Sequence, residues 1–243
     1  MNSTPLIDRP GAPEGDLGAR ADATPPLWTR VGQTFAAPAR LFAGFHDGSP
    51  WLGVLAISTL VAMAAAATIP AEYFLAEMVD PVTRLGKPVE ITSSPSEIVR
   101  WGRYRQVLSA LAMHPLIAFG MAGVLTLVFT MIGRGRATFR QYLAVSSHAL
   151  LITALGAVVG MAMRLLTADA DAEPTVATLL SFAGPAVARN AFLASLNVFS
   201  LWMLLVLGVA VAVLDGRPSW VRPAAALLGV YMLLAGASVL IAS

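Results

Sequence analysis

The sequence predicts an all-α protein, a polytopic membrane protein built as a bundle of five transmembrane helices. Of its 243 residues, 57% are hydrophobic and only 12% are charged, whereas a soluble domain averages about 25% charged residues. The apolar residues gather into runs that reach the roughly 20 residues a helix needs to cross a hydrocarbon core about 30 Å thick. Helices are expected rather than open strands, because backbone groups in a bilayer must be paired within the protein. The runs, which make residues 51–243 one transmembrane domain, are 51–71, 107–132, 142–166, 191–214 and 221–242.

Two units precede the first run. Residues 1–26 are rich in Pro, Gly, Ala and Asp and lack the apolar core of a signal peptide, so we expect a disordered cytoplasmic tail. Residues 27–50 form a juxtamembrane amphipathic segment, with aromatic residues near helical spacing beside Arg30 and Arg40. We expect one or two short helices, broken near Pro38, whose apolar side rests on the cytoplasmic leaflet. The alternative is a partly ordered lead-in to the first span.

Capping residues mark the starts of the second and third helices. Ser94, Pro95 and Glu97 supply an N-cap, a proline at the first helical position and the glutamate of a capping box. The second helix should therefore begin near Pro95, before the apolar run itself. Thr138 and Gln141 form the same kind of box and predict the start of the third helix.

Prolines mark further boundaries. Pro185 and Pro223 stand where the fourth and fifth helices should open, because proline is tolerated in the first helical turn. Pro115 lies inside the second helix and predicts a kink there. The stretch Glu173–Ala183 is apolar but too short to span, so we expect it to lie along the outer surface or to re-enter the membrane.

The distribution of Lys and Arg sets the expected orientation. The N-terminal region shares one side of the membrane with two short, densely basic connections, one after the second helix and one after the fourth. The positive-inside rule places that side in the cytoplasm and the C-terminus outside. Basic groups beside a span attract anionic lipid head groups. The arginines expected to make this contact are Arg134, Arg136 and Arg140.

Polar residues at membrane depth are the candidates for chemistry, because they are costly there. The candidates are His114, Ser147, His148 and Asn197, of which His148 and Asn197 should lie about two turns inside the third and fourth helices. One interpretation is a cluster that handles protons or ions. The other is interhelical hydrogen bonding, worth roughly 1 kcal/mol per pair.

Gly156 and Gly160 form a Gly-x-x-x-Gly pattern on the third helix. Glycines four residues apart let another helix approach closely. The partner is either a second copy of the chain or a neighbouring helix of the same chain.

The sequence holds no signature of an enzyme. Cysteine is absent, and neither a His-Glu-x-x-His zinc motif nor a Gly-x-Ser-x-Gly nucleophile elbow occurs. The acidic residues fall in loops, at helix ends or in the tail, so no carboxylate pair is expected inside the membrane. We therefore expect no catalytic residue, metal or cofactor. A formal net charge of only +2 is too weak to suggest nucleic acid as a partner.

Three segments are similar to stretches of bacterial Yip1-domain proteins. Thr138–Ala149 resembles the segment after a basic loop in which a Phe-x-x-x-hydrophobic stretch opens the third helix. Asn197-Val198-Phe199-Ser200-Leu201-Trp202, followed by Gly208, is similar to the family's Asn/Asp-x-Phe-Ser-x-Trp stretch in the fourth helix. Phe35–Phe42 resembles the family's Pro-x-x-x-Phe lead-in. The resemblance covers roughly Thr34 to the C-terminus.

The resemblance implies five spans and a cytoplasmic N-terminal tail in the bacterial cytoplasmic membrane. The Asp-Leu-Tyr-Gly-Pro type signature of the family's eukaryotic branch, which binds prenylated GTPases in vesicle traffic, is absent. The resemblance therefore implies the fold more than that role.

We predict a non-enzymatic membrane scaffold or adaptor of Yip1 type, acting in membrane organisation or trafficking. Its expected partners are the lipid bilayer, anionic lipid head groups, an unidentified membrane or cytoplasmic protein, and a second copy of the chain in a homo-oligomer. The alternative is a small-solute or ion transport component that uses polar residues of the third and fourth spans. Transporters often carry internal repeats with broken helices at matching positions, and five runs do not divide into equal halves.

Overall fold

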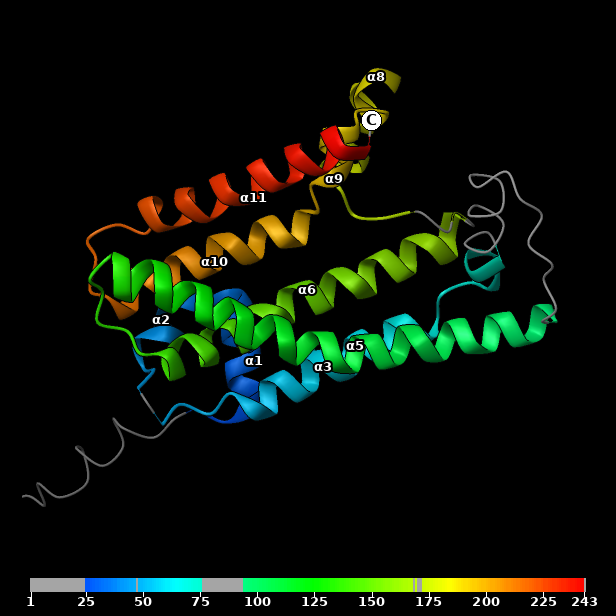
Figure 1. The fold of residues 1–243 in the computed structure, drawn as a ribbon. Coiled ribbons are helices and arrows are strands. Elements are labelled where there is room, and N and C mark those ends of the chain that lie inside the picture. Colours follow the sequence, from blue (N-terminus) through cyan, green and yellow to red (C-terminus); the bar gives the residue numbers. More distant parts are fainter. Residues whose placement is uncertain (1–24, 47, 76–93, 168, 170–171, 243) are drawn as a thin grey trace, which may run out of the picture.

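The computed structural model describes residues 25–46, 48–75, 94–167, 169 and 172–242, and these residues fold into a bundle of helices without a β-strand (Figure 1). The predicted all-α class is therefore confirmed. Consecutive long helices run in opposite directions, which places 133–138 and 215–220 at one end of the bundle, on the left in Figure 1. The long helices are α3 (Leu52–Ala67), α5 (Pro95–Leu125), α6 (Phe139–Thr167), α10 (Val198–Leu214) and α11 (Val221–Ala242).

Three of these helices are long and apolar enough to cross a membrane: α6, α11, and α5 with its continuation to Ile132. The continuation, η1 (Thr126–Ile132), is a π-helix that the sequence pattern does not reveal. Helices α3 and α10 are apolar but have only 16 and 17 residues. At 1.5 Å per residue they extend about 24–26 Å. The predicted first span, 51–71, is too long because α3 ends at Ala67, ahead of Pro70, which lacks the N–H that a helix interior needs.

The predicted fourth span, 191–214, is wrong as a continuous helix. Its residues form α9 (Ala191–Ser195) and α10, separated by Leu196 and Asn197 in an extended conformation. The side chain of Asn197 accepts hydrogen bonds from the backbone N–H groups of Phe199 and Ser200, at 3.0 and 3.3 Å. Asparagine is a strong N-cap, so α10 begins after this residue instead of running through it.

Neighbouring segments satisfy the backbone at this break. The N–H of Val176 donates to the carbonyl of Leu196 at 2.9 Å, and the N–H of Val198 donates to that of Pro174 at 3.0 Å. The N–H of Asn197 donates to the hydroxyl of Tyr231 on α11, at 3.2 Å. Because unpaired backbone groups are costly away from water, these bonds allow the helix to be interrupted.

Pro185 does not open the fourth helix as predicted. It begins the four-residue α8 (Pro185–Ala188), which follows α7 (Val176–Leu179) and the 3₁₀ helix η2 (Ser181–Ala183). These short helices agree with the expectation that the stretch around 173–183 is too short to span. The other start signals are confirmed, since Pro223 lies in the first turn of α11.

Both predicted capping boxes are present. Ser94 and Glu97 cap α5 reciprocally. Before α6, the N–H of Thr138 donates to the side-chain oxygen of Gln141 at 2.8 Å, and the N–H of Gln141 donates to the hydroxyl of Thr138 at 3.3 Å. Helix α5 continues through Pro115.

Helix α6 lies at the centre and packs against α3, α5 and α10. Every residue from Tyr142 to Ile152 is buried. Small residues of α5, among them Ala118 and Ala122, lie fully buried in the core.

The segment before α3 forms two helices, α1 (Leu27–Ala36) and α2 (Pro38–Ala43), with the expected break at Pro38. For α2 the expectation that the apolar side rests on the leaflet is wrong, whereas Trp28 of α1 is 72% exposed. Leu41, Phe42 and Phe45 are buried in the core of the bundle. The closely packed interior of the bundle offers these side chains more van der Waals contacts than an outer surface does.

Arg30 of α1 fixes this segment to the start of α3. Its side chain is buried and donates to the carbonyl oxygens of Pro25 and Pro50, at 3.1 and 2.6 Å. Burial lowers the pKa of the Arg30 guanidinium. The predicted tail, apart from its last two residues, lies outside the described residues.

Candidate functional site

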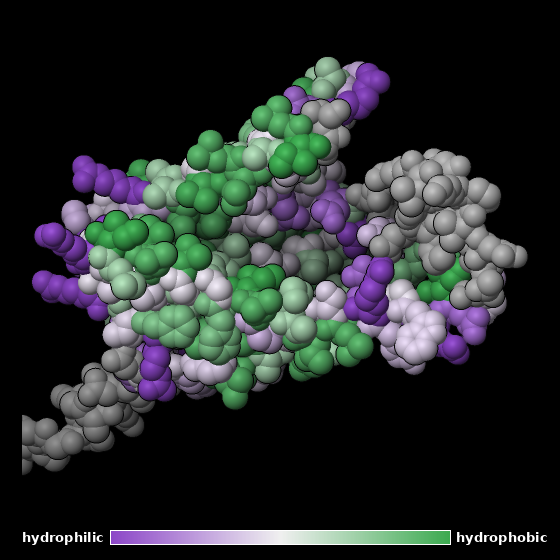
Figure 2. Space-filling model, in the orientation of Figure 1, coloured by the Kyte–Doolittle hydropathy of each residue, from purple (hydrophilic) through white to green (hydrophobic). Residues whose placement is uncertain are grey.

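One end of the bundle, which we call the basic end, carries exposed arginines around the turns 133–138 and 215–220. Figure 2 shows hydrophilic side chains projecting from the left end, while apolar side chains cover much of the middle of the same face. In the described part of this end the only carboxylate is Asp215, whose side chain is 2% exposed. The charge that faces the surroundings is therefore positive. The exposed arginines are Arg40, Arg134, Arg136, Arg140 and Arg222.

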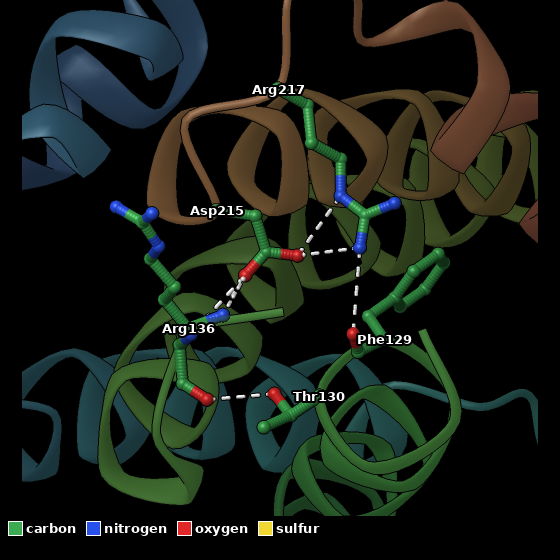
Figure 3. A network of polar contacts seen from close by, with 6 residues as sticks. Phe129, Thr130, Arg136, Asp215 and Arg217 are labelled. Atoms are coloured by element: carbon green, nitrogen blue, oxygen red, sulfur yellow. Dashed lines mark hydrogen bonds and ion pairs between the residues drawn. The ribbon is translucent and has the colours of Figure 1, made fainter. Parts of the chain in front are cut away.

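Asp215 is held in a network that we call the Asp215 clasp, formed by Phe129, Thr130, Arg136, Ala137, Asp215 and Arg217 (Figure 3). One oxygen of the carboxylate accepts from the backbone N–H groups of Arg136 and Ala137, at 3.0 and 3.2 Å. The other accepts from Nε and Nη2 of Arg217, at 3.0 and 2.8 Å. Arg217 also donates to the carbonyl of Phe129 at 3.4 Å. The clasp thus joins the α5–α6 turn to the end of α10.

The turn is shaped to fit this carboxylate. A Cβ at Gly135 would lie 2.5–2.6 Å from the oxygens of Asp215 and 2.6 Å from the carbonyl of Phe129, so only glycine fits. Arg134 adopts φ of 53°, in the left-handed region that non-glycine residues rarely occupy. The backbone of this turn is therefore fixed, and the side chains of Arg134 and Arg136 project from a defined position.

Sequence reasoning found the arginines of this turn but missed Asp215. A signal was present, because a carboxylate directly after the C-terminus of an apolar helix opposes the helix dipole and needs a nearby cation. Arg217, two residues later, is that cation.

The predicted polar cluster of His114, Ser147, His148 and Asn197 is not joined by hydrogen bonds in the described structure. Ser147 donates to the carbonyl of Leu143 at 2.8 Å, and Nδ1 of His148 lies 2.7 Å from the carbonyl of Ala144. Nε2 of His114 and Nε2 of His148 are both buried without a partner. Polar side chains on a helix commonly bond to the preceding turn of the same helix.

The fourth member, Asn197, belongs to another place in the fold. The helix break puts it at the N-terminus of α10, whereas the ring of His148 packs on Phe45 with centroids 5.1 Å apart. The two residues therefore serve different neighbours.

Asn197 instead lines a recess of about 300 Å³ between α3, α6 and α10. Small residues form most of its wall. Polar groups stand at one side of it, where Arg164 pairs with Glu173 at 3.0 Å. The lining residues are Ala62, Ala65, Ala66, Thr153, Gly156, Ala157, Gly160, Arg164, Glu173, Pro174, Asn197 and Ser200.

Gly156 and Gly160 pack against residues of their own chain. A Cβ at Gly156 would lie 2.7 Å from the side chain of Phe199 on α10. A Cβ at Gly160 would lie 3.5 Å from Pro174, an ordinary contact. The geometry thus accounts for Gly156 by packing within the chain, whereas no close contact with the described residues requires a glycine at position 160.

The described residues hold no group of three or more His, Cys, Asp or Glu side chains that could bind a metal ion. No family model, curated protein or solved structure matches the chain. The resemblance to Yip1-domain proteins therefore stays a prediction.

Proposed function

We propose that this chain is a five-span membrane protein that acts, without catalysis, as a scaffold or adaptor in membrane organisation or trafficking, as its resemblance to bacterial Yip1-domain proteins implies. The observation that carries the proposal is the basic end. There the Asp215 carboxylate is withdrawn into the clasp, and the exposed arginines stand on a fixed backbone. Such a surface suits anionic lipid head groups and acidic segments of partner proteins.

The positions of the two shorter helices, α3 and α10, support five membrane crossings. Helix α3 packs along α5 and α6, and α10 packs along α6 and α11. If α5, α6 and α11 cross the membrane, α3 and α10 lie within the same slab. Helices a few ångströms shorter than the hydrocarbon core are accommodated by local thinning of the bilayer at modest cost.

The basic end faces the cytoplasm in this proposal. Its exposed charges are all positive in the described residues, whereas Glu97, Glu173 and Asp169 are exposed at the opposite end together with arginines. The positive-inside rule counts Lys and Arg in short connections, and the two short connections of the basic end carry Arg134, Arg136 and Arg217. The start of α1 lies at the basic end through the bond from Arg30 to Pro50, so the N-terminal tail emerges on the cytoplasmic side.

A scaffold is favoured over a conduit by the buried hydroxyl groups. The hydroxyls of Ser58 and Ser147 donate to the carbonyls of Leu55 and Leu143, within their own helices. The buried hydroxyls of Thr59, Tyr142 and Ser146 have no hydrogen-bond partner among the described residues. They form no chain of polar contacts from one helix to the next along which an ion could pass.

The transport alternative has one observation in its favour. The break between α9 and α10 exposes a helix N-terminus beside a recess with polar residues. Interrupted helices of this kind form substrate sites in many transporters. We therefore keep transport as the second candidate function.

The scaffold proposal is tested with the full chain reconstituted in vesicles that contain zwitterionic and anionic lipids. The variant replaces Arg134, Arg136 and Arg140 by Gln, and a matched control replaces three arginines of the opposite end, Arg100, Arg103 and Arg189. Each basic group near an anionic surface is worth about 1 kcal/mol. The basic-end variant should lose anionic lipids from the purified complex, as counted by native mass spectrometry, and should recruit fewer partner proteins.

Equal losses in the two variants would contradict the proposal. A solute flux in proteoliposomes that disappears on replacing Asn197 by Leu, in a protein that stays folded, would favour transport instead.

A further inference from the structure

The recess between α3, α6 and α10 is open because its floor lacks large side chains. Ala62, Ala65 and Ala66 face it from α3, and Gly156, Ala157 and Gly160 face it from α6. The recess has a volume of about 300 Å³ and opens to the outside of the bundle beside the crossing of α6 and α10. This volume lies at the lower limit of the range typical of ligand sites, about 300–1,000 Å³.

The depth of the recess follows from its position on α6. Arg164 comes 25 residues after the first residue of α6, Phe139, which corresponds to about 37 Å along the helix axis. A hydrocarbon core is about 30 Å thick. If α6 crosses the bilayer from the basic end, Arg164 reaches the outer head-group layer, and the floor extends from about 6 Å below it at Gly160 to about 16 Å below it at Thr153.

The ion pair at this level can open at little cost. Arg164 and Glu173 share one contact of 3.0 Å, and their side chains are 21% and 51% exposed. Partly exposed pairs of this kind contribute little to stability. The guanidinium has further N–H groups that can grip a phosphate bidentately. The second oxygen of Glu173 can accept from an ammonium group.

Deeper in the recess, two donors from α10 have no hydrogen-bond acceptor among the described residues. Asn197 uses its side-chain oxygen to cap α10 and leaves its NH₂ group without a bond, and the hydroxyl of Ser200 makes none. Donors at this depth match the ester carbonyl groups of a phospholipid, which lie below its head group.

We propose that the recess binds a phospholipid of the outer leaflet whose head group carries an ammonium and a phosphate. Arg164 binds the phosphate, Glu173 binds the ammonium, Asn197 and Ser200 donate to the ester carbonyls, and the first part of a chain lies over the alanines and glycines. A soluble molecule that carries both an ammonium and a phosphate group would offer the same charged groups to the recess as this phospholipid. The proposal rests on α6 crossing the membrane with the basic end in the cytoplasm, as the proposed function has it, and is independent of the scaffold role of the basic end.

The test measures thermal unfolding of the full chain in a non-ionic detergent during titration with three probes. These are phosphatidylethanolamine, phosphatidylglycerol, which lacks the ammonium, and glycerophosphoethanolamine, which lacks the chains. A ligand that binds only the folded state raises Tm with concentration. We expect phosphatidylethanolamine to raise Tm more than phosphatidylglycerol at equal concentration.

Variants locate the binding. Arg164→Gln and Glu173→Gln should each weaken the apparent affinity for phosphatidylethanolamine about tenfold or more, because each removes a hydrogen bond to a charged group. Ala157→Leu fills the floor and should abolish the rise in Tm. The matched control, Arg189→Gln, removes an exposed arginine that lies outside the recess and should bind as the natural chain does.

The outcomes separate the sources of the ligand. If Tm rises with glycerophosphoethanolamine and with neither phospholipid, the ligand is a soluble molecule and the lipid proposal is overturned. The lipid proposal is also overturned if the two phospholipids raise Tm equally, or if neither of them raises Tm. Glu173 is half exposed, so Glu173→Gln leaves the fold intact and keeps the test decisive even if Ala157→Leu does not fold.

Discussion

At the scale of single residues, the clearest device is the Asp215 carboxylate. The carboxylate accepts hydrogen bonds from two backbone N–H groups of the α5–α6 turn and from the guanidinium of Arg217, and only 2% of its side chain is exposed. One acidic residue thereby fixes the position of a turn that carries several basic ones. The geometry explains why Gly135, whose Cβ would collide with the carboxylate, belongs at its position.

Replacing Asp215 by Asn should lower the free energy of unfolding by about 1–3 kcal/mol, because it weakens hydrogen bonds to a charged group and leaves Arg217 without its partner. Denaturation in mild detergent measures the effect. Glu72→Gln, at an exposed carboxylate of the opposite end, is the control and should change the value by less than about 0.5 kcal/mol. An Asp215 variant as stable as the natural chain would show that the clasp contributes nothing to the fold.

At the scale of elements, the crossing of α6 and α10 depends on one of two glycines. A Cβ at Gly156 would press on Phe199 at 2.7 Å, whereas a Cβ at Gly160 would meet Pro174 at 3.5 Å. The two glycines share one sequence motif, yet the structure gives them unequal roles.

Gly156→Ala should therefore destabilise the protein by about 1–3 kcal/mol, the usual cost of overpacking. Gly160→Ala should leave stability unchanged or raise it by up to about 1 kcal/mol, because alanine is the better helix former. Thermal unfolding of the two variants side by side makes the comparison. The interpretation as packing within the chain fails if Gly160→Ala is the more damaging change, or if Gly156→Ala alters only the oligomeric state.

The sequence predicted the helices that start with a clear cap and end at a polar turn. The starts at Pro95 and Phe139 follow from local side chains, so periodicity and capping suffice to place them. The break at Asn197 was missed because the segment 191–214 is apolar throughout, and its interruption depends on partners at Pro174, Val176 and Tyr231 that are distant in sequence. The recess and the clasp were missed for the same reason.

The burial of α2 shows the same limit. Hydrophobic spacing predicted that Phe42 and Phe45 lie on one side of a short helix, but spacing does not distinguish lipid from a bundle interior as the apolar surroundings. Only the tertiary contacts place both rings in the core.

At the scale of the whole molecule, the five helices alternate in direction, so the topology is fixed once one turn is placed. Reporter fusions at Gly135, Ala172 and Ser243 should report inside, outside and outside. The positive-inside rule and the exposed arginines of the basic end are the reason. A fusion at Gly135 that reports outside would reverse the orientation of the entire bundle.

A second prediction for the whole molecule concerns the deletion of the N-terminal tail. Because Arg30 donates to the carbonyl of Pro25, the structure sets the boundary of a safe deletion at residue 24. A chain without residues 1–24 should insert with unchanged oligomeric state and lose the recruitment of partner proteins, as seen in affinity purification. If partners co-purify equally, the binding surface lies on the basic turn instead.

The Asp215 clasp also has a consequence for the order of events during synthesis. The carboxylate lies 79 residues after the backbone N–H of Arg136 that it binds. A ribosome adds about 5–20 residues per second, so roughly 4–16 s pass between the appearance of the turn and that of its partner. During this interval the turn is complete but unanchored, and only the arrival of the fourth helix fixes it. The clasp thus closes late, after the first three long helices have been synthesised.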